Sequence, residues 1–192
     1  GYKILALWEN GFRHITNNVR PINVPADLKG IKLRTPSSTW RVKMFKSYGA
    51  NPSPLSFGEV FVALKTGTFD GQENPFAQIA SARFQEVQKY LSLTGHVYTP
   101  GYVVADPKKW ATIPADVAAI VEQAAKDTQA FVYKYAAELD DKLLAELKAG
   151  GIAVNEANKQ AFIDASAPIY EEFGKSVKGG TDMVKKAISL GK

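Results

Sequence analysis

Short extended segments alternate with helical segments over the first 105 residues of the chain. Four segments have the alternating or continuous apolar pattern of strands, a fifth is a proline-rich extended segment, and several are bounded by proline or glycine. These predicted strands are residues 2–8, 31–35, 51–55, 90–98 and 102–105. Between the second and the third, residues 37–48 carry apolar side chains near helical spacing. Alternating strands and helices predict an α/β fold with a mainly parallel sheet covered by helices.

Capping residues place the starts of two further helices. Ser56 and Glu59 have the spacing of a capping box, which predicts a helix over residues 57–66. Asn74 followed by Pro75 is typical of an N-cap and the first helical position, so a third helix is predicted to begin there.

One predicted helix is much longer than the others. An apolar stripe at helical spacing runs through residues 114–149, and Gly150 and Gly151 end it. Such a helix would be about 50 Å long, so it must bridge two bodies, bend or project. A short strand at 152–154 is predicted to follow, and then closing helices. These closing helices are predicted at residues 156–165, 168–173 and 181–190.

Composition limits the class of protein. The chain has 192 residues, of which 45% are hydrophobic, enough for a core within one domain. No stretch approaches the about 18 consecutive apolar residues of a membrane helix. Residues 1–5 lack the features of a secretory signal, so any signal peptide is expected to have been removed. The absence of cysteine excludes disulfides and thiolate metal sites, and it fits a periplasmic or a cytosolic protein.

The net charge of +5 raises the question of nucleic-acid binding. Lysine and arginine are spread along the chain without a block of like charge, and the densest region, residues 29–46, is typical of a solvated face. We therefore predict no nucleic-acid partner.

Motifs for catalysis are missing. The chain has no nucleophile elbow, phosphate loop or zinc-protease motif, and neither His14 nor His96 has a carboxylate at ligand spacing. Asp70 and Glu73, in a predicted strand or turn over residues 69–73, form a candidate acid/base pair, but turn formation explains them better. We predict no catalytic residue, no metal and no cofactor.

Three polar residues are suited to holding an anion. Arg34 ends a predicted strand just before a helix, where open α/β sheets bind ligands, and its guanidinium can grip a carboxylate with two hydrogen bonds. Arg13 is predicted at another strand-end loop, and Asn74 at a helix N-terminus. The alternatives are surface salt bridges for the two arginines and an ordinary N-cap for Asn74.

Several motifs resemble those of the solute receptors of tripartite ATP-independent periplasmic (TRAP) transporters. The resemblance covers about the first 105 residues in order and spacing, and the helical remainder also fits. It is carried by WENGFR (8–13), Asn17, RPI (20–22), DLKGIKLRTP (27–36), GANP (49–52), FGEVFVALKTG (57–67), DGQENP (70–75) and FQEVQKY (84–90).

The resemblance implies a periplasmic-binding-protein type II-like lobe with one long helix that bridges two lobes. It also implies that Arg34 pairs with the ligand's carboxylate and that Arg13, Phe57 and Asn74 contact the ligand. Trp40 is next to the site in sequence and is a candidate for selecting the acid, with a core role as the alternative. The implied function is a periplasmic receptor that delivers a small organic carboxylate to the membrane components of a TRAP transporter.

Receptors of this family carry an N-terminal lobe before the strand that opens this chain. Residues 1–100 are then the C-terminal, ligand-binding lobe, and residues 101–140 are expected to pack on the absent lobe. Residues 141–192 are expected to return to the C-terminal lobe. The apolar surface of residues 102–135 would lack its cover, so self-association is predicted. Two other functions stay open: a small hydrolase or transferase with an anion site, and a helical adaptor built around residues 114–149.

Overall fold

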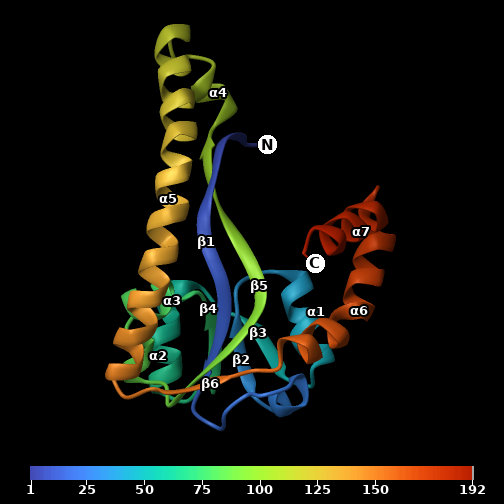
Figure 1. The fold of residues 1–192 in the computed structure, drawn as a ribbon. Coiled ribbons are helices and arrows are strands. Elements are labelled where there is room, and N and C mark those ends of the chain that lie inside the picture. Colours follow the sequence, from blue (N-terminus) through green and yellow to red (C-terminus); the bar gives the residue numbers. More distant parts are fainter. Residues whose placement is uncertain (192) are drawn as a thin grey trace.

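A single six-stranded sheet organises the protein, as a computed structural model of residues 1–191 shows (Figure 1). The strand order is β3-β2-β4-β1-β5-β6. β1 is antiparallel to both of its neighbours, while β2 is parallel to β3 and β4, and β5 is parallel to β6. Five strands therefore run in one direction, which confirms the predicted α/β fold with a mainly parallel sheet. The strands are β1 (Lys3–Asn17), β2 (Lys32–Thr35), β3 (Asn51–Pro54), β4 (Gly71–Asn74), β5 (Tyr90–Ala105) and β6 (Ala153–Glu156).

Helices cover both faces of the sheet (Figure 1). α1 and α6 pack together on one face, and α3 packs with α5 on the other. The α-helices are α1 (Thr39–Ser47), α2 (Val60–Lys65), α3 (Phe76–Ser81), α4 (Pro107–Trp110), α5 (Ala115–Ala149), α6 (Lys159–Ser176) and α7 (Gly180–Leu190). Short 3-10 turns are η1 (Pro25–Leu28), η2 (Phe57–Glu59) and η3 (Phe84–Glu86).

Two apolar cores lie on opposite sides of the sheet. Phe45 and Phe162 join α1 and α6 to the first core, which also contains Leu28 of η1 and Leu33 of β2. The second core is formed by α2, α3, η3 and the C-terminal end of α5, whose Leu147 is fully buried. The sheet between the cores is therefore a fixed frame on which strand ends hold their side chains.

A long two-stranded ribbon leaves this body. β1 and β5 pair along almost their whole length and rise beside α5 (Figure 1). The predicted strands at residues 2–8, 90–98 and 102–105 are thus parts of two longer strands. Pro100 was expected to interrupt β5, but it pairs with Glu9 next to a register shift in β1. A proline is tolerated at such a bulge because the ladder already lacks a hydrogen bond there.

The C-terminal region also differs from the prediction. α6 is one helix that continues through Pro168, where a break between two helices was predicted. A proline removes only one backbone donor, and the helix bends instead of ending; α6 changes direction along its length (Figure 1). Within residues 1–191, no helix combines the length and apolar character needed to cross a bilayer.

The capping box predicted at Ser56 is not formed. Its side chain makes no cap hydrogen bond, because residues 57–59 first form a 3-10 turn and α2 begins only at Val60. By contrast, Ser38 caps α1, since its side chain accepts a hydrogen bond from the backbone N–H of Arg41.

Candidate anion-binding site

The candidate site lies at the carboxyl ends of β2 and β4, where β4 pairs with the C-terminal part of β1. β2 and β4 are parallel neighbours, so their carboxyl ends bring Arg34 and Asn74 to one edge of the sheet. Asn74 pairs with His14 of β1 across the other side of β4. The approach of β4 to β1 depends on Gly71, where a Cβ would lie only 2.3 Å from the carbonyl oxygen of Thr16.

Arg34 is buried without a counterion. Its side chain is held by Leu55, whose carbonyl oxygen accepts from Nε at 2.9 Å and from Nη2 at 2.6 Å. Arg34 is only 4% exposed, and no carboxylate of residues 1–191 forms an ion pair with it. A buried guanidinium that lacks a charged partner is costly, so its position favours the arrival of an anion.

Glu73 of β4 is the centre of a second group of charges. Its carboxylate is fully buried and accepts from Arg13 Nε at 2.6 Å and Nη2 at 3.0 Å, and from Arg41 Nη1 at 3.2 Å. The Nε2 atom of His96 lies 3.1 Å from the same carboxylate. Two guanidiniums and one imidazole therefore share a single negative charge.

Charges within the cluster set its protonation states. Burial alone raises the pKa of Glu73, but hydrogen bonds and charges from His96 and Arg13 outweigh it and hold this pKa at about 2. Burial and the charges of Arg13 and Arg41 lower the pKa of His96 despite the attraction of Glu73. A neutral His96 that donates from Nε2 to Glu73 accepts at Nδ1 from the hydroxyl of Thr94, 2.7 Å away.

Arg34 belongs to the same electrostatic environment. Burial lowers the pKa of Arg34, the charge of Glu73 opposes this effect, and the positive charges of Arg13 and Arg41 lower it further. Arginine starts from so high a pKa that the guanidinium stays charged at neutral pH. Three guanidiniums and one carboxylate thus gather at this edge of the sheet with a surplus of positive charge.

The structure brings Arg13 and Asn74 together but corrects where each lies. Arg13 lies within β1, not in a strand-end loop, because β1 continues to Asn17. Asn74 is the last residue of β4, and the N-cap position of α3 belongs to Pro75, so Asn74 does not cap the helix. Instead, Oδ1 of Asn74 accepts from Arg13 Nη2 at 2.8 Å.

The rings of Phe57 and Trp40 make their contacts outside the charge cluster. Phe57 follows two residues after Leu55 and packs edge-on against Phe84, with 44% of its surface exposed. Trp40 is partly buried and meets Phe173 of α6 edge-on at 5.3 Å, with the ammonium of Lys43 over its ring. In this structure the Trp40 ring therefore joins α1 to α6.

Sequence reasoning missed three members of the cluster: Glu73, Arg41 and His96. Glu73 was assigned to turn formation, but it lies in a strand of four buried residues, three of them polar. The sequence did contain a signal for this: Glu73 is a charged residue in a short run of polar residues between Gly71 and Pro75. Arg41 lies one turn into α1 and reaches Glu73 across 32 positions, which local spacing does not indicate.

A network of side-chain hydrogen bonds holds β4 in place. Nδ2 of Asn74 donates to Gln72, and Nε2 of Gln72 donates to Thr16 at 2.9 Å. Thr16 in turn donates to Gln88 at 2.9 Å. Because these buried partners satisfy one another, the backbone that carries Glu73 and Asn74 is held rigidly.

Asn74→Asp is expected to weaken the binding of an anion. The substitution places a carboxylate beside Arg13 and removes the N–H that donates to Gln72. The new negative charge repels an anionic ligand, so affinity should fall by about tenfold or more, which corresponds to ~1.4 kcal/mol. Calorimetry with an organic acid measures this effect, with Asn51→Asp on exposed β3 as the matched control. Equal affinities for Asn74→Asp and wild type would show that Asn74 is remote from the ligand.

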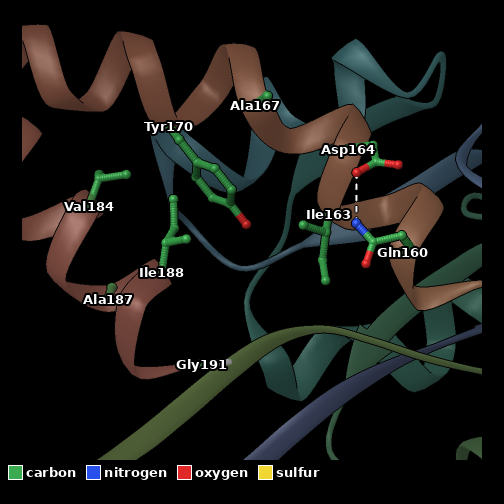
Figure 2. A pocket seen from close by; sticks show the side chains of 9 residues that line it. All are labelled: Gln160, Ile163, Asp164, Ala167, Tyr170, Val184, Ala187, Ile188 and Gly191. Carbon is green, nitrogen blue, oxygen red and sulfur yellow. Dashed lines mark hydrogen bonds between the residues drawn. The ribbon is translucent and has the colours of Figure 1, made fainter.

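A separate groove of about 680 Å³ lies between α6 and α7 (Figure 2). Its walls are mostly apolar, and two of its polar side chains, Gln160 and Asp164, form a hydrogen bond with each other at 2.8 Å. None of the arginines described above lines it. The surplus of guanidinium groups therefore lies at the strand edge and not in this groove.

The fold and the site together form an α/β lobe with an excess of guanidinium groups at the carboxyl ends of β2 and β4. Residues 1–191 contain no group of three or more His, Cys, Asp and Glu side chains arranged for a metal ion. The chain belongs to family 7 of the bacterial extracellular solute-binding proteins, because the sequence model of that family matches residues 1–176.

Relatives and solved structures agree with this family. The chain is 40% identical over 187 residues to the 2,3-diketo-L-gulonate-binding periplasmic protein YiaO of Escherichia coli, covering 96% of this chain and 57% of that protein. A TRAP periplasmic solute-binding protein from Polaromonas bound to D-erythronate aligns with a TM-score of 0.91, at 36% identity, covering 97% of this chain and 61% of the other. One from Shewanella oneidensis with bound succinate aligns with a TM-score of 0.93, at 28% identity, covering 100% and 63%.

These matches settle the class of protein and its compartment. The family consists of periplasmic solute-binding receptors and not enzymes, as the sequence predicts. The solved relatives bind small carboxylates. The chain spans less than two thirds of the length of the relatives it matches.

Proposed function

We propose that this protein captures a small organic carboxylate in the periplasm and delivers it to the membrane components of a TRAP transporter. The observation that carries the proposal is the buried, charged Arg34, which is fixed by Leu55 and has no counterion among residues 1–191. A carboxylate that meets this guanidinium gains charge-assisted hydrogen bonds and compensates a desolvated cation.

Arg13, Asn74, Phe57 and Trp40 complete the proposed binding site. Arg13 and Asn74 are bonded to each other next to the arginine anchor, and Phe57 offers an exposed ring close to Leu55. The acids bound by the relatives, D-erythronate and succinate, fit a site with one strong carboxylate anchor and further polar groups. A role for Trp40 would be to set the position of α1, since its ring contacts Phe173.

Residues 101–140 are proposed to pack on a second lobe, as in a two-lobed receptor with residues 1–100 and 141–192 forming the first lobe. Support comes from the apolar side chains that this region leaves exposed, among them Tyr102, Val104, Ile120 and Phe131. Large exposed apolar patches mark surfaces that bind another body. Closure of a second lobe would exclude water from the arginines and strengthen their hold on the ligand.

A thermal-shift screen against a panel of organic acids tests the proposed function. Binding at 100 times the dissociation constant stabilises the folded state by about 2.7 kcal/mol, so at least one acid should raise the melting temperature of the protein at its natural length. Recovery of the acid unchanged separates a receptor from a hydrolase or transferase. A helical adaptor would show no shift with any acid, and that outcome would contradict the proposal.

The exposed apolar surface of residues 102–135 is expected to drive self-association of the 192-residue polypeptide. Ile120 is 68% exposed and Phe131 is 65% exposed on α5, so burial of this surface is favourable. Light scattering should give a mass above that of one chain, and the double substitution Ile120→Lys, Phe131→Lys should reduce it. Ile163→Lys, at the α6–α7 groove, is the control. A stable monomer at high protein concentration would contradict the account of this surface.

A further inference from the structure

Arg41 belongs to the charge cluster, but the proposed function, with Arg34 as the carboxylate anchor, gives Arg41 no role. It lies near the start of α1, and its Nη1 donates to Oε1 of Glu73 at 3.2 Å. The side chain is 16% exposed, compared with 7% for that of Arg13 and 0% for that of Glu73. Arg41 is thus held at the open side of the cluster, where a ligand would arrive.

Each of the three guanidiniums keeps unused donors. Among residues 1–191, Nη1 of Arg13 and Nη1 of Arg34 have no hydrogen-bond acceptor, and Arg41 uses only its Nη1. Because a guanidinium presents its donors in a fixed planar arrangement, these remaining N–H groups are available as directed contacts.

The charges of the cluster are also unequal in number. Glu73 is the one carboxylate that contacts these guanidiniums within residues 1–191, and Arg13 already makes a two-pronged pair with it. His14 and His96, the imidazoles nearest the cluster, are buried. The three arginines and Glu73 therefore carry two positive charges in excess, and a ligand with one carboxylate compensates only one of them.

We infer that Arg41 is a specificity-determining residue, which makes the site prefer acids that carry two negative charges over matched acids that carry one. The inference rests on the proposed function, with Arg34 as the anchor of the first carboxylate. Glu73 keeps the guanidinium of Arg41 in place for the second anionic group, at the more exposed side of the cluster. A second negative charge near Arg41 offsets the remaining surplus of positive charge, because Glu73 alone is shared by Arg13 and Arg41, whereas a neutral group there leaves that surplus uncompensated.

The test compares ligands that differ in charge but hardly in size. Succinate and its half-amide, succinamate, form one such pair, and tartrate and erythronate form another. Calorimetry at neutral pH should show that the protein binds the doubly charged acid of each pair at least about tenfold more tightly than the singly charged acid. Arg41→Gln should bring this ratio close to one while the affinity for succinamate stays within about threefold. Arg83→Gln, an exposed arginine paired only with Glu86, should leave the ratio unchanged.

A conservative variant separates specificity from folding. Arg41→Lys keeps the positive charge, so it should retain much of the preference for succinate even if Arg41→Gln lowers the melting temperature. The inference would be overturned if wild type bound the two acids of a pair with equal affinity. It would also be overturned if the ratio of the affinities for succinate and succinamate were the same in Arg41→Lys as in Arg41→Gln. A protein that binds the singly and doubly charged acids equally well leaves the proposed function intact, whereas one that binds no acid of the thermal-shift panel contradicts the proposed function itself.

Discussion

Arg34→Ala is expected to abolish tight binding of the carboxylate ligand. Loss of one partner of a desolvated charge pair costs roughly 2 to 5 kcal/mol, or about 30-fold to several thousandfold in affinity. Arg34→Lys should also bind poorly, because an ammonium cannot hold both the Leu55 carbonyl and a carboxylate with the geometry of a guanidinium. Isothermal calorimetry with the best acid from the thermal-shift screen measures both variants.

Arg20→Ala is the matched control for this experiment. Arg20 also donates to two backbone carbonyl oxygens, those of Asp27 and Lys29, but it has no place in the cluster. Its replacement should leave affinity unchanged. Affinity of Arg34→Ala within about threefold of wild type would show that another group anchors the carboxylate.

Glu73→Gln is expected to cause the largest loss of stability. The substitution keeps the size of the side chain but leaves the buried guanidinium of Arg13 without its counterion, and removal of one partner of a buried ion pair costs ~3 to 5 kcal/mol. Urea denaturation measures the free energy of unfolding. Glu59→Gln, an exposed glutamate of η2, should change it by less than about 0.5 kcal/mol. A Glu73→Gln protein as stable as wild type would contradict the account of the cluster.

The stabilities of wild type and Glu73→Gln should respond differently to a fall in pH. The pKa of Glu73 is held at about 2 in the folded protein, below its ordinary value of 4.5, so its ionised form stabilises the fold. That contribution is complete above the unfolded pKa and is lost as the pH falls from about 4.5 towards 2. The stability difference between wild type and Glu73→Gln should therefore narrow over this range, whereas an unchanged difference would mean that the charge of Glu73 is unimportant.

The parts of the fold that sequence could predict are those whose burial follows apolar patterning. β2 and α1 appear where alternation, Pro36 and Gly49 placed them, because each buries apolar side chains such as Leu33 and Phe45. The second half of β1 was missed because buried positions there hold polar side chains such as Thr16 and Asn17. These residues are buried because distant partners satisfy their hydrogen bonds, and local patterning does not show such partners.

Of the candidate site, the sequence predicted Arg34 but not Glu73 or the strand that holds Arg13. Arg34 was found because a strand that ends before a helix places its last residues at the binding edge of a parallel sheet. Glu73 was missed because it becomes significant only when folding brings Arg13, 60 positions away, against it. The element that holds Arg13 was assigned wrongly for a related reason, since Gly11 and the polar residues around it resemble a loop until β5 pairs with them.

A crystal structure with the acid that gives the largest thermal shift tests the central claim most directly. The account predicts a carboxylate oxygen within hydrogen-bond distance of Nη1 of Arg34, with the donors of Arg13 and Arg41 directed at the same ligand. It also predicts that Glu73 keeps its contacts with both arginines. An acid bound elsewhere, such as in the groove between α6 and α7, with the guanidinium of Arg34 left unpaired, would contradict the account.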